Sequence, residues 1–173
     1  MPGPRLCRAT VPVAGHLYTV LVDLADGAVV AGGFCPAEEL FARLGSTERQ
    51  DVPSAADLPA APENHPVLDA LRRYAAGQLD ALDETPVRQP ATPFYAEVRA
   101  ALRRIPPGET WSYTELAAAA GRPAAVRAAG GGCASNRVAL IVPCHRVLAA
   151  GRKLGGYAYG ANVKAALLEH ERG

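Results

Sequence analysis

The chain has 173 residues, of which 49% are hydrophobic and 20% charged, and its formal net charge is +1. These values exclude a disordered chain, and the length allows one compact domain or two small ones. We expect no signal peptide, because Met1–Arg5 opens into mixed sequence, and no membrane span, because no apolar stretch approaches the roughly 20 residues that one needs. The expected location is the cytoplasm, where the four cysteines would stay reduced.

The small net charge hides an asymmetry along the chain. Residues 1–96 contain seven arginines and twelve acidic residues, a net charge of −5. Residues 97–173 contain eleven lysines and arginines and five acidic residues, a net charge of +6. A basic half is typical of a module that faces nucleic acid, although a chain of this size also shows such a split by chance.

The first third of the chain predicts a sheet followed by a helix. Apolar or β-branched runs predict three strands, at 6–11, 17–24 and 28–34. Asp26-Gly27 between the last two runs predicts a hairpin. Pro36 suits the first turn of a helix over 37–44.

The middle of the chain predicts a loop, a helix and a linker. Residues 45–63 are polar and proline-rich and predict a surface loop. Apolar residues at helical spacing predict an amphipathic helix over 65–79. Three prolines predict a linker over 85–93, which would separate a domain at 1–88 from a second domain at 93–173.

The second domain begins with helical patterns. Helical spacing predicts a helix over 94–105. Ser112-Tyr113-Thr114-Glu115 is a capping box that would open a helix ending at Gly121. A second helix would run from Ala124 to about Ala129 and end at Gly130-Gly131-Gly132. This outline fits a helix-turn-helix, and it equally fits a plain helical hairpin.

A cysteine motif follows. Pro143-Cys144-His145-Arg146-Val147 comes directly after Ala139–Val142, an apolar run that predicts a buried strand. A rigidly held thiol beside an imidazole suggests an activated nucleophile. The alternative is a small, inert, buried cysteine beside a chance histidine.

Four other features accompany this thiol, each with two interpretations. Arg127 is either a cationic probe on an alanine-rich helix or a solvated arginine. Asn136, eight residues before Cys144, either braces the turns around the strand and binds a ligand or forms a local turn. The Gly/Tyr loop at 155–160 suits a flat heteroaromatic ligand or covers a core. Glu171, near the end of a helix over 162–172, either orients His145 or lies on a frayed terminus.

These motifs occur in the order and spacing of the O6-alkylguanine-DNA alkyltransferases, and residues 93 to 171 resemble that family. The matching motifs are Ser112-Tyr113, Arg127-Ala128-Ala129-Gly130, Asn136, Pro143–Val147, Gly156-Tyr157 and Lys164–Leu168. The N-terminal half resembles the family only in outline. The resemblance implies an α+β protein, in which an N-terminal ribonuclease-H-like α/β domain precedes a mostly α-helical domain with a helix-turn-helix.

The resemblance also implies direct-reversal DNA repair by a single-turnover, suicide methyltransferase. O6-alkylguanine, and by extension O4-alkylthymine, would be flipped out of the duplex and would transfer its alkyl group irreversibly to Cys144. The thiol proton would pass through a water to His145, which Glu171 orients. Tyr113 would protonate or hydrogen-bond the guanine ring, and Asn136 would hold the base.

Further roles follow from the same resemblance. Arg127 would fill the gap left by the flipped base from the minor groove. The remaining DNA-contact surface would comprise Ala125, Ala128, Ala129, Gly130 and Tyr113. The base pocket would comprise Cys133, Val147, Tyr157 and Ala158. The implied partner is double-stranded DNA, bound largely without regard to sequence by a cytoplasmic, nucleoid-associated monomer.

We expect no cofactor and no metal. Cys7, Cys35, His16 and His65 are similar in type to the ligands of the structural zinc in some relatives, but their spacing does not match. Two other functions remain open. One is a non-catalytic damage sensor, against which the acceptor Cys144 argues, and the other is a helix-turn-helix transcription regulator, which would bind a promoter tightly and specifically.

Overall fold

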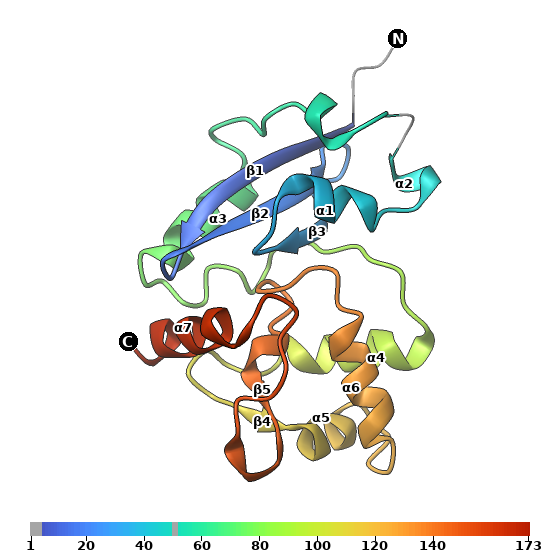
Figure 1. The fold of residues 1–173 in the computed structure, drawn as a ribbon, viewed down its shortest axis with the longest axis vertical. Helices are drawn as coiled ribbons and strands as arrows, with labels where there is room; N and C mark the ends of the chain where they lie inside the picture. Colours follow the sequence, from blue (N-terminus) through green and yellow to red (C-terminus); the bar gives the residue numbers. More distant parts are fainter. Residues whose placement is uncertain (1–4, 50–51) are drawn as a thin grey trace. The chain divides into compact units, whose positions relative to one another are not determined.

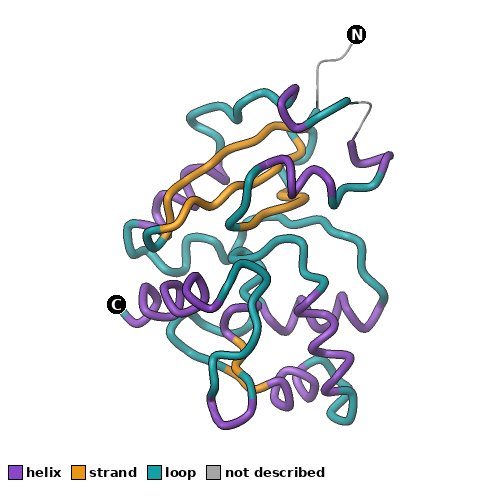
Figure 2. The backbone as a smooth tube through the Cα atoms, viewed as in Figure 1, coloured by secondary structure: helices purple, strands orange, loops and turns teal. Residues whose placement is uncertain are grey.

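The computed structural model of the protein describes residues 5–49 and 52–173 (Figure 1). The chain divides into two compact units, with the boundary between Gln89 and Pro90. The first unit contains an antiparallel sheet in the order β1-β2-β3, and the second consists mainly of helices (Figure 2). The protein is thus a mixed helix-and-sheet fold. Within the described residues, no helix combines the length and the apolar character that crossing a membrane requires.

The three predicted strands are confirmed, as β1 (Leu6–Val13), β2 (His16–Asp23) and β3 (Val29–Gly33). The predicted hairpin joins β2 to β3, and Gly27 supplies the left-handed residue of its turn, with φ 74°. Both faces of the sheet are covered, with α1 in front and α3 behind in Figure 1. This explains why β2 is buried continuously from Tyr18 onward instead of alternating.

The helices of the first unit are α1 (Ala37–Ala42), α2 (Ser46–Arg49) and α3 (Pro66–Ala75), with a 3-10 turn at Ala55–Asp57. The predicted helix over 65–79 is confirmed as α3, although it ends four residues earlier. His65, one of the weighed metal ligands, instead caps α3, since its Nδ1 accepts a hydrogen bond from the Val67 N–H at 3.2 Å. In the described part of the chain, no cluster of three or more metal-binding side chains occurs.

The prediction of a plain surface loop over 45–63 is wrong. Besides α2 and the 3-10 turn, the segment runs beside β1, where Arg8 N–H donates to Pro59 O at 2.9 Å and Ala61 N–H donates to Arg8 O at 2.8 Å. Ala55 and Leu58 are only 2% and 3% exposed and join the core. The few apolar residues among the prolines show no helical or alternating period, so the local sequence did not predict the pairing of this segment with β1.

The start of the proline-rich segment is held to the first unit. Val29 N–H donates to Pro86 O, and Arg88 N–H donates to Val29 O at 3.0 Å. The Arg88 side chain pairs with Asp26 and with the fully buried Asp23. Backbone pairing therefore continues through Arg88, just before the boundary between the units.

The second unit contains four helices, α4 (Pro93–Leu102), α5 (Tyr113–Ala119), α6 (Val126–Ala134) and α7 (Ala161–Arg172). Two short strands, β4 (Trp111–Ser112) and β5 (Val147–Leu148), pair in parallel, and 3-10 turns occupy Cys144–Arg146 and Ala150–Arg152. The predicted capping box is confirmed, because Ser112 and Glu115 exchange two hydrogen bonds of 3.1 Å. Gly121 ends the helix region in the left-handed conformation, φ 87°.

The prediction that Gly130-Gly131-Gly132 would end a helix is wrong, because α6 runs through all three. The glycines allow α6 to approach α4. A Cβ at position 132 would lie 2.8 Å from Val98 Cγ1, and one at position 131 would collide with the Tyr95 hydroxyl. Packing between the two helices outweighs the low helix propensity of glycine.

This packing predicts opposite effects for two alanine substitutions. Gly132→Ala should destabilise the protein by about 1–3 kcal/mol, because the added methyl group overpacks the α4–α6 contact. Gly130→Ala is the matched control: its Cβ would be 3.9 Å from the nearest atoms, on Tyr113, so helix propensity should make it neutral or stabilising by up to about 1 kcal/mol. Denaturant unfolding followed by the fluorescence of Trp111, the single tryptophan, measures both. Equal stabilities of the two variants would contradict the close-packing explanation.

Candidate active site

Cys144 opens the 3-10 turn that connects a buried segment to β5. Its N–H donates to Val142 O at 2.8 Å, and the chain beyond the turn is fixed by the pairing of Val147 with Trp111. Pro143 precedes it and lacks an N–H, so no backbone donor is left unsatisfied there. The backbone that carries the thiol is therefore held on both sides, while the side chain stays half-buried.

The apolar run before this turn is buried, but the predicted strand is wrong. Residues 139–142 form turns and a bend instead, in which Leu140 takes a left-handed conformation, φ 71°. Every residue from Val138 to Val142 is at most 3% exposed. An apolar run of this length indicates burial, but it does not distinguish a strand from a compact turn.

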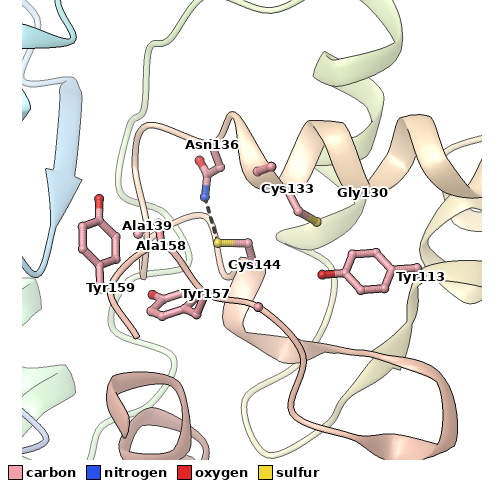
Figure 3. A pocket seen from close by; sticks show the side chains of 11 residues that line it. Tyr113, Gly130, Cys133, Asn136, Ala139, Cys144, Tyr157, Ala158 and Tyr159 are labelled. Carbon is pink, nitrogen blue, oxygen red and sulfur yellow. Dashed lines mark hydrogen bonds between the residues drawn. The ribbon is translucent and has the colours of Figure 1, made fainter. Parts of the chain in front are cut away.

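The side chain of Asn136 makes hydrogen bonds to the backbone of this buried segment, and it also points at the Cys144 sulfur (Figure 3). Its Oδ1 accepts from Val138 N–H at 3.2 Å, and its Nδ2 donates to Val142 O at 3.0 Å. The same Nδ2 lies 3.4 Å from Cys144 Sγ, within hydrogen-bonding distance for sulfur. One buried amide thus braces the turn and reaches the thiol, which combines the two roles considered for it.

His145 and Glu171 meet in the interior. His145 Nε2 lies 2.9 Å from Glu171 Oε1, and both side chains are fully buried. Arg146 completes the cluster: its Nη2 donates to Glu171 Oε1 at 2.8 Å, its Nε to Oε2 at 3.0 Å and its Nη1 to Ile105 O at 2.6 Å. Glu171 is therefore an interior residue and not part of a frayed terminus.

The electrostatics fix the charge states of this cluster. Burial alone would raise the pKa of Glu171, but hydrogen bonds from His145 and Arg146 outweigh it and lower the pKa to about 2. Burial lowers the pKa of His145, and the contact with Glu171 offsets this only in part. The imidazole is thus neutral, with its proton on Nε2 facing the carboxylate. Nδ1 is then an acceptor, and it has no hydrogen-bond partner among the described residues.

Cys144 is a neutral thiol at rest. Burial raises its pKa, while the hydrogen bond from Asn136 and the charges of Lys164 and Arg99 lower it in part. Burial and the neighbouring Cys144 also raise the pKa of Cys133, to about 12. Cys144 in addition receives the hydrogen bond from the Asn136 side-chain amide, which favours its thiolate.

A cavity of about 400 Å³ opens beside the sulfur of Cys144. Seven predicted site residues line it (Figure 3): Tyr113, Gly130, Cys133, Asn136, Cys144, Tyr157 and Ala158. Gly156 and Tyr159, from the Gly/Tyr loop that was expected to suit a flat ligand, also line it, and Ala134 and Ala139 are two lining residues that the sequence did not suggest. Tyr159 packs edge-on against Tyr157, with ring centroids 5.6 Å apart. The walls are thus small and aromatic residues, which suit a flat ring.

Two predicted site residues do not take the expected places. Val147, predicted for the base pocket, is fully buried in the β4–β5 pair and does not line the cavity. Ala129, predicted for the DNA-contact surface, is also fully buried, because it lies on the inner face of α6. Arg127 and Ala128 are exposed on the same helix, and Ala125 is half-buried.

Lys164 begins the Lys164–Leu168 motif, but the motif predicted no role for this residue in the site. It is 1% exposed, and its Nζ donates to Val147 O at 2.7 Å and to Gly156 O at 3.4 Å. It therefore ties β5 to the start of the Gly/Tyr loop, and its charge faces the two thiols. Its position between the apolar residues of α7 was the available signal, since a helix face that buries Val163 and Leu167 also turns position 164 inward.

Comparisons with known proteins agree with this site. The family model described as "6-O-methylguanine DNA methyltransferase, DNA binding domain" matches residues 93–173. A methylated-DNA–protein-cysteine methyltransferase of Shigella flexneri is 45% identical over 103 residues, and a protein of the same name from Mycobacterium tuberculosis is 48% identical over 106 residues. These matches cover 60% and 61% of this chain and 60% and 63% of the relatives, so less than two thirds of their length is matched.

Solved structures extend the likeness to both units. The crystal structure of M. tuberculosis OGT in complex with DNA matches with a TM-score of 0.72 and 31% identity, over 95% of this chain and 92% of that one. The M. tuberculosis O6-methylguanine methyltransferase matches with a TM-score of 0.71 and 30% identity, over 96% and 93%. From this near-complete coverage, together with the matching family model, the chain belongs to the O6-methylguanine DNA methyltransferase family.

Proposed function

We propose that the protein repairs alkylated DNA by direct reversal, moving the alkyl group of O6-alkylguanine to Cys144 in a single, irreversible event. The observation that carries this proposal is the position of the Cys144 sulfur, on the wall of a cavity lined by small and aromatic residues. Related proteins named methylated-DNA–protein-cysteine methyltransferase support the assignment.

The transfer is a nucleophilic displacement. The sulfur of Cys144 forms a bond to the alkyl carbon while the bond from that carbon to guanine O6 breaks. The electron pair of the broken bond stays with the base, and the proton that leaves the thiol is balanced by the proton that guanine N1 gains. The product is a thioether, which water does not cleave, so each molecule reacts once.

His145 is proposed to receive the thiol proton, with Glu171 as its partner. The unpartnered Nδ1 of a neutral imidazole is a suitable acceptor, and the Glu171 carboxylate stabilises the imidazolium that forms. Asn136 would stabilise the developing thiolate through its 3.4 Å contact. Tyr113 keeps its proton at neutral pH, because burial and the two nearby thiols raise its pKa, so it can donate to the bound base.

We further propose that α5, the turn at Gly121 and α6 act as a helix-turn-helix on double-stranded DNA. Arg127 and Ala128 are exposed near the start of α6, where small side chains permit a close approach and one cation can enter the minor groove. Binding would be largely independent of sequence and would involve a cytoplasmic, nucleoid-associated monomer without a cofactor. The unit at 93–173 would carry the chemistry, and 1–88 would be a ribonuclease-H-like scaffold.

Mass spectrometry of the intact full-length protein tests this function. After incubation with a duplex that carries one O6-methylguanine, we expect one added methyl group, mapped to Cys144, and restored guanine in the DNA. The amount repaired should never exceed the amount of protein. Repair over many turnovers at unchanged protein mass would refute the proposal.

Arg127→Ala should separate DNA engagement from chemistry. Transfer from duplex O6-methylguanine should slow by at least about tenfold, because the extruded base loses the side chain that replaces it in the stack. Reaction with free O6-benzylguanine should be nearly unchanged, because no duplex is opened. Single-turnover rates with the two substrates measure the difference, and Arg172→Ala, which removes one exposed charge from α7, outside the helix-turn-helix, is the control. Equal slowing with both substrates would remove the proposed role of Arg127.

A further inference from the structure

Arg99 is a buried cation close to the site that has no part in the mechanism above. It lies on α4 and is 7% exposed. Its Nη1 donates to Pro90 O at 2.6 Å, and its Nη2 donates to Ser135 O at 2.9 Å and to Ser135 Oγ at 3.1 Å. The guanidinium thus joins the start of the second unit to the end of α6.

Arg99 lacks a compensating anion. None of the ion pairs among residues 5–49 and 52–173 includes Arg99, and its Nε has no hydrogen-bond partner. The nearby charge of Arg137 repels the guanidinium, and the ring of Tyr95, with its centroid 5.9 Å from the guanidinium carbon, attracts it. A buried charge without a counterion is costly, so a negative charge that forms nearby is stabilised by it.

The contacts of Arg99 lead directly to the thiol. Ser135 N–H donates to Gly131 O at 3.0 Å, and Asn136 N–H donates to Cys133 O at 3.1 Å, so the two residues close the end of α6. Asn136 then contacts Cys144 Sγ through its amide. Arg99 therefore holds the Ser135 carbonyl, which is bonded directly to the backbone nitrogen of Asn136, and the Asn136 side chain contacts the sulfur.

We propose that Arg99 is a positioning residue for Cys144: it fixes the Ser135–Asn136 turn so that the amide meets the sulfur, and its charge stabilises the thiolate. Its importance for alkyl transfer rests on the function proposed above, whereas its effect on the thiol does not. The other ionisable or charged groups around Cys144 are Lys164 from α7, Cys133 from α6, Tyr113 from α5 and the His145–Glu171 pair. Lys164 and Arg99 are the two cations that lower the pKa of Cys144.

The test measures thiol ionisation without DNA. The full-length protein and its variants react with iodoacetamide between pH 7 and 11, a range that extends above the ordinary pKa of a thiol, and peptide mass spectrometry follows carboxamidomethylation of Cys144. In Arg99→Met the midpoint of the pH profile should rise by about 0.5–1 unit, and the rate near neutral pH should fall about three- to tenfold. Arg99→Lys should keep the midpoint close to that of the wild type, because it keeps the charge. It should lose part of the plateau rate, because one ammonium group cannot make all the hydrogen bonds that the guanidinium makes to Pro90 and Ser135.

Arg104→Met is the matched control. Arg104 is exposed just beyond α4 and donates to Ala119 O, so this variant also removes one arginine, but away from the thiol. Its profile should overlay that of the wild type. If Arg99→Met fails to fold, as judged by Trp111 fluorescence, then Arg99→Gln, which is neutral but retains a donor for Ser135 O, takes its place.

A folded neutral variant with the wild-type midpoint would overturn the proposal, and so would an Arg99→Lys midpoint shifted as far as that of the neutral variant. These outcomes are separable from failure of the proposed function. A wild-type protein that takes no methyl group from O6-methylguanine would refute alkyl transfer and leave the iodoacetamide result intact.

Discussion

Cys144→Ser should leave no detectable alkyl transfer, whereas Cys133→Ser should react at close to the wild-type rate. Both thiols line the same cavity, and burial raises the pKa of both, that of Cys133 to about 12. The Asn136 side-chain amide donates to Cys144 Sγ, and this hydrogen bond can stabilise the thiolate of Cys144. A serine hydroxyl is a far weaker nucleophile at neutral pH, and the substitution is small enough to leave the turn intact. Intact-protein mass spectrometry with an O6-methylguanine duplex reads out both variants.

The comparison assigns the acceptor without relying on one inactive variant. A methyl group found on Cys133 in the Cys144→Ser protein would show that proximity to the base, rather than the Asn136 contact, selects the thiol. Loss of transfer in Cys133→Ser with retained folding would show that the second sulfur takes part in the reaction. Either result would contradict the assignment of Cys144 as the sole acceptor.

Glu171→Gln should both destabilise the protein and slow alkyl transfer. It leaves the buried Arg146 without its carboxylate, which costs on the order of 3 kcal/mol. It also removes the charge that stabilises a protonated His145, so transfer should slow by about a hundredfold, a typical effect for losing general-base assistance. Glu169→Gln is the control on the same helix, because Glu169 pairs only at the surface with Arg172 and should change stability by less than about 0.5 kcal/mol. A wild-type transfer rate in a folded Glu171→Gln protein would contradict the proton-acceptor role.

The same cluster makes the wild-type protein sensitive to acid. The pKa of Glu171 is lowered from 4.5 to about 2 on folding, so its contribution to stability is complete above pH 4.5 and is lost as the pH falls toward 2. The pKa of His145 is also lowered from 6.5, because burial disfavours its charged form, so the unfolded chain binds this proton first and stability declines below pH 6.5. Unfolding free energies of the wild type between pH 7 and 3 should fall steadily, and Glu171→Gln should flatten the part of the curve below pH 4.5.

Features written in short, local patterns were predictable from the sequence. The Asp26-Gly27 hairpin and the Ser112–Glu115 capping box each depend on a few neighbouring residues, and both are confirmed. The Cys144 motif and Asn136 were identified by type and spacing, and the fold places them in contact. In each case the signal and the structure span the same short stretch of chain.

Features decided by distant partners were predicted wrongly or missed. Glycines in α6 resemble a helix stop until α4 is known to pack against them, and Val138–Val142 resembles a strand until Asn136 is seen to satisfy its backbone. The sequence also gives no means to decide which arginines turn inward. Arg146 and Arg99 are both buried, one against a carboxylate and one against backbone oxygens.

The bare glycine face of α6 has a consequence for how variation in this protein should be interpreted. A single methyl group added at position 131 or 132 meets Tyr95 or Val98 on α4. A genetic screen for alkylation resistance would score such changes as loss of repair, in the same class as substitutions of the acceptor Cys144. Measuring the amount of folded protein together with its activity would separate the two classes. The glycine variants would react normally per folded molecule, but fewer molecules would be folded.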